Sequence, residues 1–121
     1  MNDDDFRRMA LALDGAIEAA HMGHPDFRAN GRIFATLHGD GRHGMVKLTP
    51  EQQQRFMSEG DGFTPESGAW GRQGSTRVVL ADVDEDALRE ALTLAWQNSA
   101  SSPARSPRVR TSKASAARKR R

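Results

Sequence analysis

The chain has 121 residues, 36% of them hydrophobic, which is enough for one domain with a modest core and too few for two. It has no cysteine, which excludes thiolate catalysis, disulfide scaffolds and cysteine-ligated metal centres and fits a cytoplasmic location. No apolar run approaches the roughly 18 residues of a membrane helix, and the acidic start at residues 1–5 is unlike a signal peptide.

The formal charge of +2 hides two segments of opposite charge. Residues 1–97 hold all sixteen acidic residues against ten basic ones and carry −6. Residues 98–121 are rich in Ser, Ala and Pro and cannot bury enough apolar surface to offset the entropy of ordering. We therefore expect a folded domain of residues 1–97 and a disordered basic tail of residues 98–121. The tail cations are Arg105, Arg108, Arg110, Lys113, Arg118, Lys119, Arg120 and Arg121.

A flexible arm with eight cations attracts anions, and three partners fit it: nucleic acid, an anionic membrane surface, or the protein's own acidic body. A solubilising extension with no fixed partner explains the same composition. The tail is thus a candidate contact for nucleic acid, and its composition does not choose between these partners.

The N-terminal residues 3–13 are expected to form an amphipathic helix. Phe6, Met9 and Ala10 follow the spacing of one buried helix face, and Asn2 or Asp3 can cap the helix at its start. Residues 16–21 form a candidate short strand.

An Asn30-Gly31 pair readily supplies the two positive φ angles of a type I′ turn, so residues 26–29 and 32–38 are expected to pair as a hairpin. Simple alternation along the second strand places its odd-numbered residues on one side and its even-numbered residues on the other. These are Ile33, Ala35 and Leu37 against Phe34, Thr36 and His38.

After a glycine-rich turn at 39–44, residues 45–48 are expected to form the next strand, with Lys47 directed away from Val46 and Leu48. Thr49 and Gln52 then form a capping-box pattern around a proline, which predicts a helix that runs to residue 59.

The rest of the domain is expected to be a Gly/Pro-rich loop at 60–75, a strand at 76–80 and a helix at 84–97. Phe63 and Trp70 are expected to anchor the loop by packing against the core. Leu88 and Leu92 lie on the apolar face of the last helix, with Ala91, Ala95 and Trp96. Without the candidate strand at 16–21, the order is α-β-β-β-α-β-α. It predicts an α+β domain with helices packed on a mostly antiparallel sheet.

Several runs in this order resemble the MmcQ/YjbR family over roughly residues 5–97. They are His24-Pro25-Asp26-Phe27-Arg28, the segments 31–37 and 46–51, Phe63-Thr64-Pro65, Trp70-Gly71-Arg72, and the strand and helix from Arg77 to Trp96. The resemblance implies a CyaY-like (frataxin-like) fold. It also implies a DNA-binding role attributed to a double-wing arrangement of strands, in a non-enzymatic bacterial protein. It supplies no catalytic residues.

Nucleic-acid binding by the folded domain needs exposed cations near an aromatic side chain. The candidates are Arg42, Lys47, Trp70, Arg72 and Arg77, beside the tail cations. The competing interpretation is that these charges belong to an ordinary solvated face. The charge of −6 on the domain also opposes strong attraction to phosphates.

Other chemistries find little support. His21 with His24, and Asp40 with His43, do not reach the three or four convergent ligands of a zinc site. No phosphate loop or nucleophile motif is present, so we expect no enzyme activity, no metal and no cofactor. The alternative function is a small-molecule- or protein-binding module, with a pocket formed by Trp70 and residues 21–27 and a tail that only solubilises or tethers.

Overall fold

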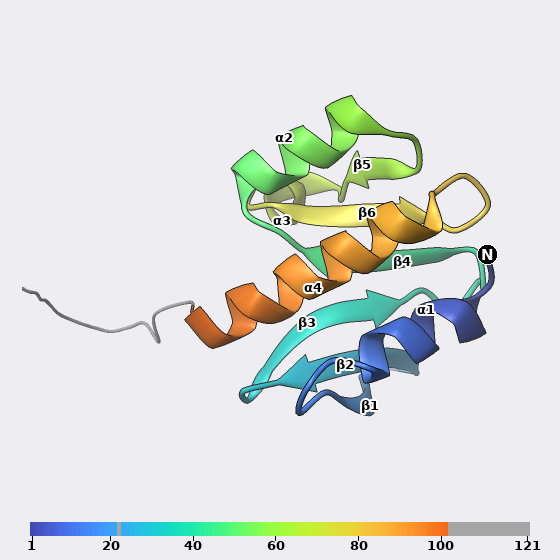
Figure 1. Ribbon diagram of the computed structural model, residues 1–121, viewed down its shortest axis with the longest axis vertical. Helices are drawn as coiled ribbons and strands as arrows, with labels where there is room; N and C mark the ends of the chain where they lie inside the picture. Colours follow the sequence, from blue (N-terminus) through green and yellow to red (C-terminus); the bar gives the residue numbers. More distant parts are fainter. Residues whose placement is uncertain (22, 102–121) are drawn as a thin grey trace, which may run out of the picture.

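The computed structural model describes residues 1–21 and 23–101 (Figure 1). Four helices and six strands make up this part of the chain. In order, they are α1 (Asp3–Leu11), β1 (Ile17–His21), β2 (His24–Ala29), β3 (Arg32–Leu37), β4 (His43–Lys47), α2 (Pro50–Glu59), β5 (Phe63–Pro65), α3 (Gly68–Arg72), β6 (Ser75–Val79) and α4 (Glu85–Ser101).

The strands form one sheet in the order β1-β2-β3-β4-β6-β5, and every neighbouring pair is antiparallel. Helices α1, α2 and α4 lie on one face of the sheet, nearest the viewer in Figure 1, and the short helix α3 lies on the other side. We call this other side the open face. The α+β class and the mostly antiparallel sheet are as predicted.

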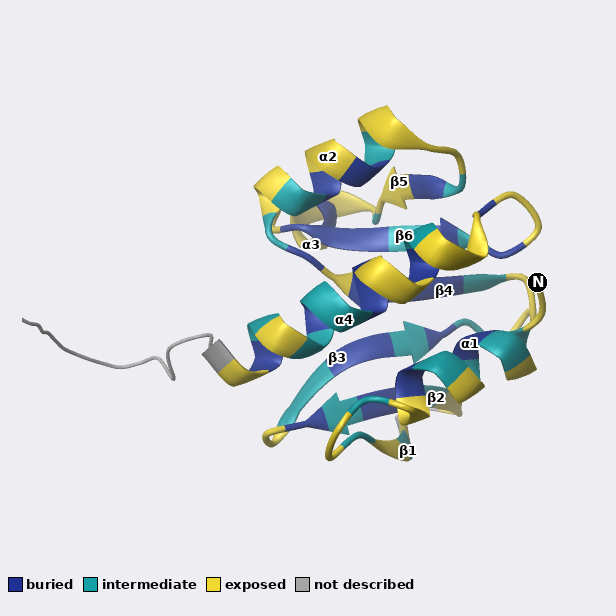
Figure 2. Ribbon diagram, viewed as in Figure 1, coloured by how far each residue is buried: buried dark blue, intermediate teal, exposed yellow. Residues whose placement is uncertain are grey.

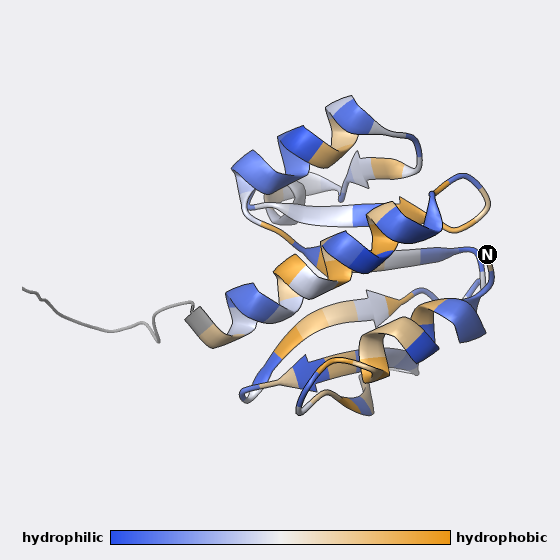
Figure 3. Ribbon diagram, viewed as in Figure 1, coloured by the Kyte–Doolittle hydropathy of each residue, from blue (hydrophilic) through white to orange (hydrophobic). Residues whose placement is uncertain are grey.

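The core lies between the sheet and the three helices. It includes Phe6 from α1, Phe27 from β2 and Val46 from β4, all fully buried, and Leu88, Ala91, Leu92 and Ala95 from α4. Figures 2 and 3 show that the sheet-facing stripe of α4 is buried and largely hydrophobic. Trp96 packs against this core and donates from Nε1 to the Asp14 carbonyl oxygen at 2.8 Å.

Two local predictions are confirmed in detail. Asn30 and Gly31 have φ angles of 57° and 76°, as a type I′ turn requires, and they join β2 to β3. Thr49 caps α2 by accepting from the Gln52 backbone N–H, while the Gln52 side chain accepts from the Thr49 N–H. The candidate strand at 16–21 is also present, as β1.

The predicted alternation along β3 is wrong in its first half. The β2–β3 register shifts between Phe27 and Arg28: Phe27 is opposite Ala35 and Arg28 is opposite Ile33, so Phe34 has no partner in β2. Such a bulge interrupts the alternation of a strand and lets two neighbouring residues face the same side. Phe34 is therefore fully buried in the core, whereas Ile33 lines a pocket on the open face together with Thr36.

The segment 60–75 is not the continuous loop that was predicted, because it contains β5 and α3. Both elements are too short to have a periodic pattern, at three and five residues. The last helix was also predicted to end too early: α4 continues to Ser101, and Ser99 within it is buried. The predicted tail, apart from its first four residues, lies outside the described residues.

Within the part of the chain that the structure describes, no helix combines the length and the apolar character needed to cross a membrane.

Candidate nucleic-acid interface

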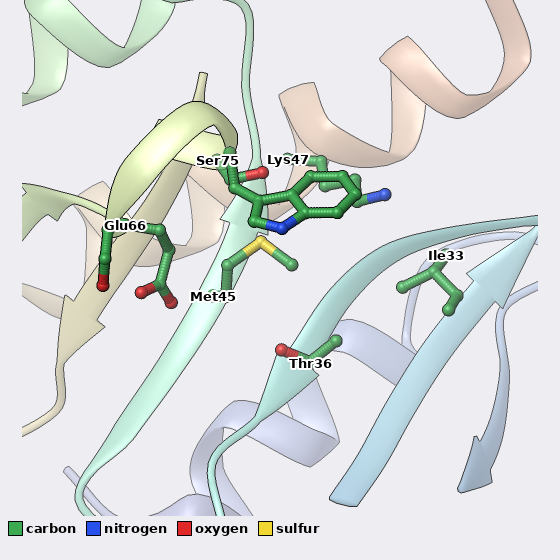
Figure 4. Close-up of a pocket in the computed structure, with 8 residues that line it drawn as sticks. Ile33, Thr36, Met45, Lys47, Glu66 and Ser75 are labelled. Carbon is green, nitrogen blue, oxygen red and sulfur yellow. The ribbon is translucent and has the colours of Figure 1, made fainter. Parts of the chain in front are cut away.

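A pocket of about 340 Å³ lies on the open face, between α3 and strands β3, β4 and β6. Its lining combines apolar side chains with hydroxyl and charged groups: Ile33, Thr36, Met45, Lys47, Glu66, Ser67, Trp70 and Ser75. Figure 4 shows Thr36, Met45 and Lys47 directed into the same space from β3 and β4. Two of the predicted site residues, Lys47 and Trp70, therefore meet at one pocket.

Lys47 reaches the pocket because of its position in β4. Its neighbours Val46 and Leu48 are buried on the helix side, so the lysine side chain is exposed on the open face, as predicted. The Lys47 Nζ lies 6.0 Å from the centroid of the Trp70 ring, within the range of a cation–π interaction.

Trp70 does not pack against the core as predicted, because 65% of the residue is exposed. The cause lies in α3, where Gly71 is the buried residue and a Cβ there would collide with the Glu66 carbonyl oxygen. The Gly71 backbone therefore packs against the Glu66 backbone, and the indole of Trp70 points to the exposed side of α3. Phe63, the other predicted anchor, is buried, and its ring centroid lies 5.1 Å from that of Phe56, with the two rings tilted by 49°.

A buried glutamine of α2 fixes α3 in this position. Gln53 is 5% exposed, and its Nε2 lies 3.1 Å from the carbonyl oxygens of both Gly71 and Ser75. Its amide thereby connects α2 to the end of α3 and the start of β6. Gln53 could not be singled out from the sequence, since a glutamine inside a polar helix has no distinguishing pattern.

Arg77 faces the pocket side of β6, but a carboxylate balances its charge. Its guanidinium donates to Glu66 Oε1 at 3.2 Å, and His38 Nε2 lies 3.1 Å from the other Glu66 oxygen. Glu66 is 14% exposed at its side chain. This network makes Arg77 a poorer phosphate ligand than its sequence position indicated, and sequence reasoning missed Glu66 altogether.

Arg42 lies away from the pocket, in the turn before β4, whereas Lys47 ends that strand. Its backbone N–H donates to Asp40, whose other carboxylate oxygen lies 2.7 Å from His43 Nδ1. The Arg42 N–H and then the His43 ring hold the pKa of Asp40 well below its ordinary value. Arg72 is exposed on α3, and neither Arg42 nor Arg72 makes a side-chain ion pair within the described residues.

The predicted cations thus do not form one continuous positive face. The tail cations Arg105, Arg108, Arg110, Lys113, Arg118, Lys119, Arg120 and Arg121 lie outside the described residues. The pocket predicted for the alternative function is found near Trp70, but residues 21–27 do not form it as predicted: Phe27 is fully buried in the core and His24 is exposed, and neither lines the pocket.

The described residues contain no group of three or more His, Cys, Asp or Glu side chains arranged to hold a metal ion. Asp40 and His43, one of the pairs considered above, are bonded to each other. The side chain of His21 is not among those described.

Comparison with known proteins gives one match. The model of the YjbR family matches residues 11–98, which is most of the folded part of the chain. Neither the curated proteins nor the solved structures contain a significant match. The match includes β1 to β6 and most of α4, and so includes every residue that lines the pocket. The chain belongs to the YjbR family.

Proposed function

We propose that the chain is a non-enzymatic, cytoplasmic DNA-binding protein in which the open face near Trp70 and Lys47 orients the DNA. The basic tail supplies phosphate contacts that do not depend on sequence. The observation that carries the proposal is a contact at the end of α4. Asn98 Nδ2 donates to the Lys47 carbonyl oxygen at 3.1 Å, three residues before the last described residue. The last turn of α4, from which the tail continues, is therefore bonded to the backbone of the residue whose side chain lines the pocket on the other face.

The charges explain why the tail is needed. The body is acidic, and its open-face arginines Arg77 and Arg28 are bonded to Glu66 and Asp26. Non-specific affinity for DNA depends mainly on the number of phosphates that cations neutralise. The eight tail cations outnumber the exposed cations of the body near the pocket, so we expect them to supply most of the binding free energy.

The test compares the natural chain with a full-length variant in which all eight tail cations are glutamine. Fluorescence anisotropy with a labelled duplex, measured across a salt series, gives the slope of log K against log salt. This slope approaches about −7 if all eight cations contact phosphates, and it should fall close to zero in the variant. If the variant keeps the affinity and slope of the natural chain, the tail has no such role.

The pocket favours a second candidate function, a small-molecule-binding module. A volume of about 340 Å³ lies at the lower end of the range for ligand sites. This function is preferred if neither the natural chain nor the variant binds DNA near physiological salt.

A further inference from the structure

The pocket contains a buried hydroxyl group with no partner in the protein. Ser75 is only 8% exposed, yet its Oγ has no hydrogen-bond partner among the described residues. Its carbonyl oxygen, in contrast, accepts from Gln53 and from the Glu66 N–H. Buried polar side chains nearly always have a partner, because an unpaired one loses its hydration without compensation. The Ser75 hydroxyl therefore points to a ligand.

The groups around this hydroxyl define the chemistry of that ligand. Ser75 is paired with Lys47 across the β4–β6 ladder, so the two side chains share the open face. Thr36 adds a second hydroxyl without a described partner, and Met45 forms an apolar floor that is 9% exposed. Trp70 supplies a flat aromatic surface beside a lysine. These groups suit a planar ring with a polar edge and a nearby negative charge.

Glu66 does not disturb this arrangement, although it also lines the pocket. Both of its carboxylate oxygens are engaged, one by Arg77 and the other by His38. The lysine ammonium has no ion pair with any described residue, so among the charged groups of the pocket it is available to an anion.

We propose that the pocket holds one unpaired nucleobase of a single-stranded nucleic acid. This inference rests on the proposed function and names the form of the substrate. The base stacks on Trp70, its polar edge bonds to Ser75 and Thr36, and the adjoining phosphate lies at Lys47. Stacking on an aromatic side chain is tolerant of base identity, since every base has a π face. A duplex cannot fill the pocket, because its bases are already stacked and paired.

The experiment measures the binding of three ligands to the full chain at one salt concentration: a 15-nucleotide dT strand, a duplex of the same length, and free dTMP. The chain has two tryptophans, so Trp96→Phe leaves Trp70 as the only tryptophan and makes its fluorescence a direct report of stacking. We expect the strand to quench this emission and the duplex not to. In the natural background, which keeps Trp96, the change Trp70→Ala should weaken strand binding about tenfold or more and have little effect on duplex binding.

Ser75→Ala separates a ligand-binding role from a structural one. Removal of an unpartnered buried hydroxyl should leave the melting temperature unchanged or raise it, while strand affinity falls several-fold. Lys47→Gln should weaken strand binding, and the matched control Arg89→Gln, with the same change of charge on the helix-covered side, should have a smaller effect.

The outcomes distinguish this inference from the proposed function. Equal binding of strand and duplex, with no quenching of Trp70, overturns the base pocket but leaves DNA binding by the tail intact. Failure to bind either form overturns both. Quenching by dTMP with the same affinity as the strand overturns the assignment to a strand and puts a free nucleotide in the pocket.

Discussion

Gly44 offers the sharpest test of how α1 is seated on the sheet. This residue lies in β4, under the ring of Phe6 from α1, and both are buried. A Cβ at position 44 would lie 2.6 Å from Phe6 Cε2 and 3.0 Å from Cζ, whereas ordinary carbon–carbon contacts are about 3.5–4.0 Å. Gly44→Ala therefore requires the Phe6 ring to move by about 1 Å. This ring also packs against Phe27, with 5.9 Å between the two ring centroids.

Overpacking of this kind costs about 1–3 kcal/mol. Alanine also reduces the entropy of the unfolded chain, which returns about 0.4–1 kcal/mol, so we expect a net loss of about 1–2 kcal/mol. In a domain of this size, each kcal/mol lowers Tm by about 4–8 °C. Thermal unfolding followed by circular dichroism measures this shift.

Gly60→Ala is the matched control. Gly60 has an extended backbone with φ of −163°, and a Cβ there meets no atom within 4 Å. This variant should be as stable as the natural protein or slightly more stable. Combining Gly44→Ala with Phe6→Leu should cost less than the sum of the two single changes, because the smaller side chain relieves the clash. Equal stability of the two glycine variants, or strict additivity, would refute this account.

Three further predictions concern the site and its surroundings. Glu66→Gln should leave the Arg77 charge unbalanced, so that binding to duplex DNA tightens and the salt slope steepens by up to about 0.9, while Tm falls. Gln53→Ala should cost about 1–3 kcal/mol and weaken strand binding without touching the open face, with faster hydrogen exchange in α3. Asp40→Asn should lower stability near neutral pH. The difference should be full above about pH 4 and shrink steadily as the pH falls below it, because the unfolded chain then binds a proton at Asp40 that the folded chain, with its depressed pKa, does not yet bind.

Each of these has a result that contradicts it. Weaker duplex binding by the Glu66 variant would mean that Arg77 contributes to binding only in the position in which Glu66 holds it. Unchanged exchange in α3 after Gln53→Ala would show that the glycine contacts alone hold this helix. A stability difference between Asp40→Asn and the natural chain that does not shrink as the pH falls below about 4 would trace the effect to packing instead of charge.

The predictions from sequence succeeded where the signal is local. The capping box at Thr49 and Gln52 and the Asn30-Gly31 turn each depend on a few adjacent residues, and both are present as expected. Lys47 was placed correctly because its neighbours on both sides are apolar. Such features need no knowledge of the rest of the fold.

The failures concern tertiary contacts. Trp70 is exposed because Gly71 is the residue of α3 that packs against the Glu66 backbone, a contact that the residue types alone do not indicate. The bulge in β2–β3 turns Phe34 inward against simple alternation. Ser75 is an ordinary strand residue in sequence, and its interest comes only from a hydroxyl that the fold buries without a partner.

The attachment point of the tail connects the two parts of the proposed function. Asn98 is bonded to Lys47, and α4 ends three residues later. Arg105 follows Asn98 by seven residues, and even a fully extended segment of that length spans at most about 25 Å. A strand whose base occupies the pocket would therefore present its neighbouring phosphates inside the reach of the first tail cations. The two contacts then act as one bivalent site, in which the first raises the effective concentration for the second. An acidic body with few unpaired cations can in this way bind a polyanion without a continuous positive face.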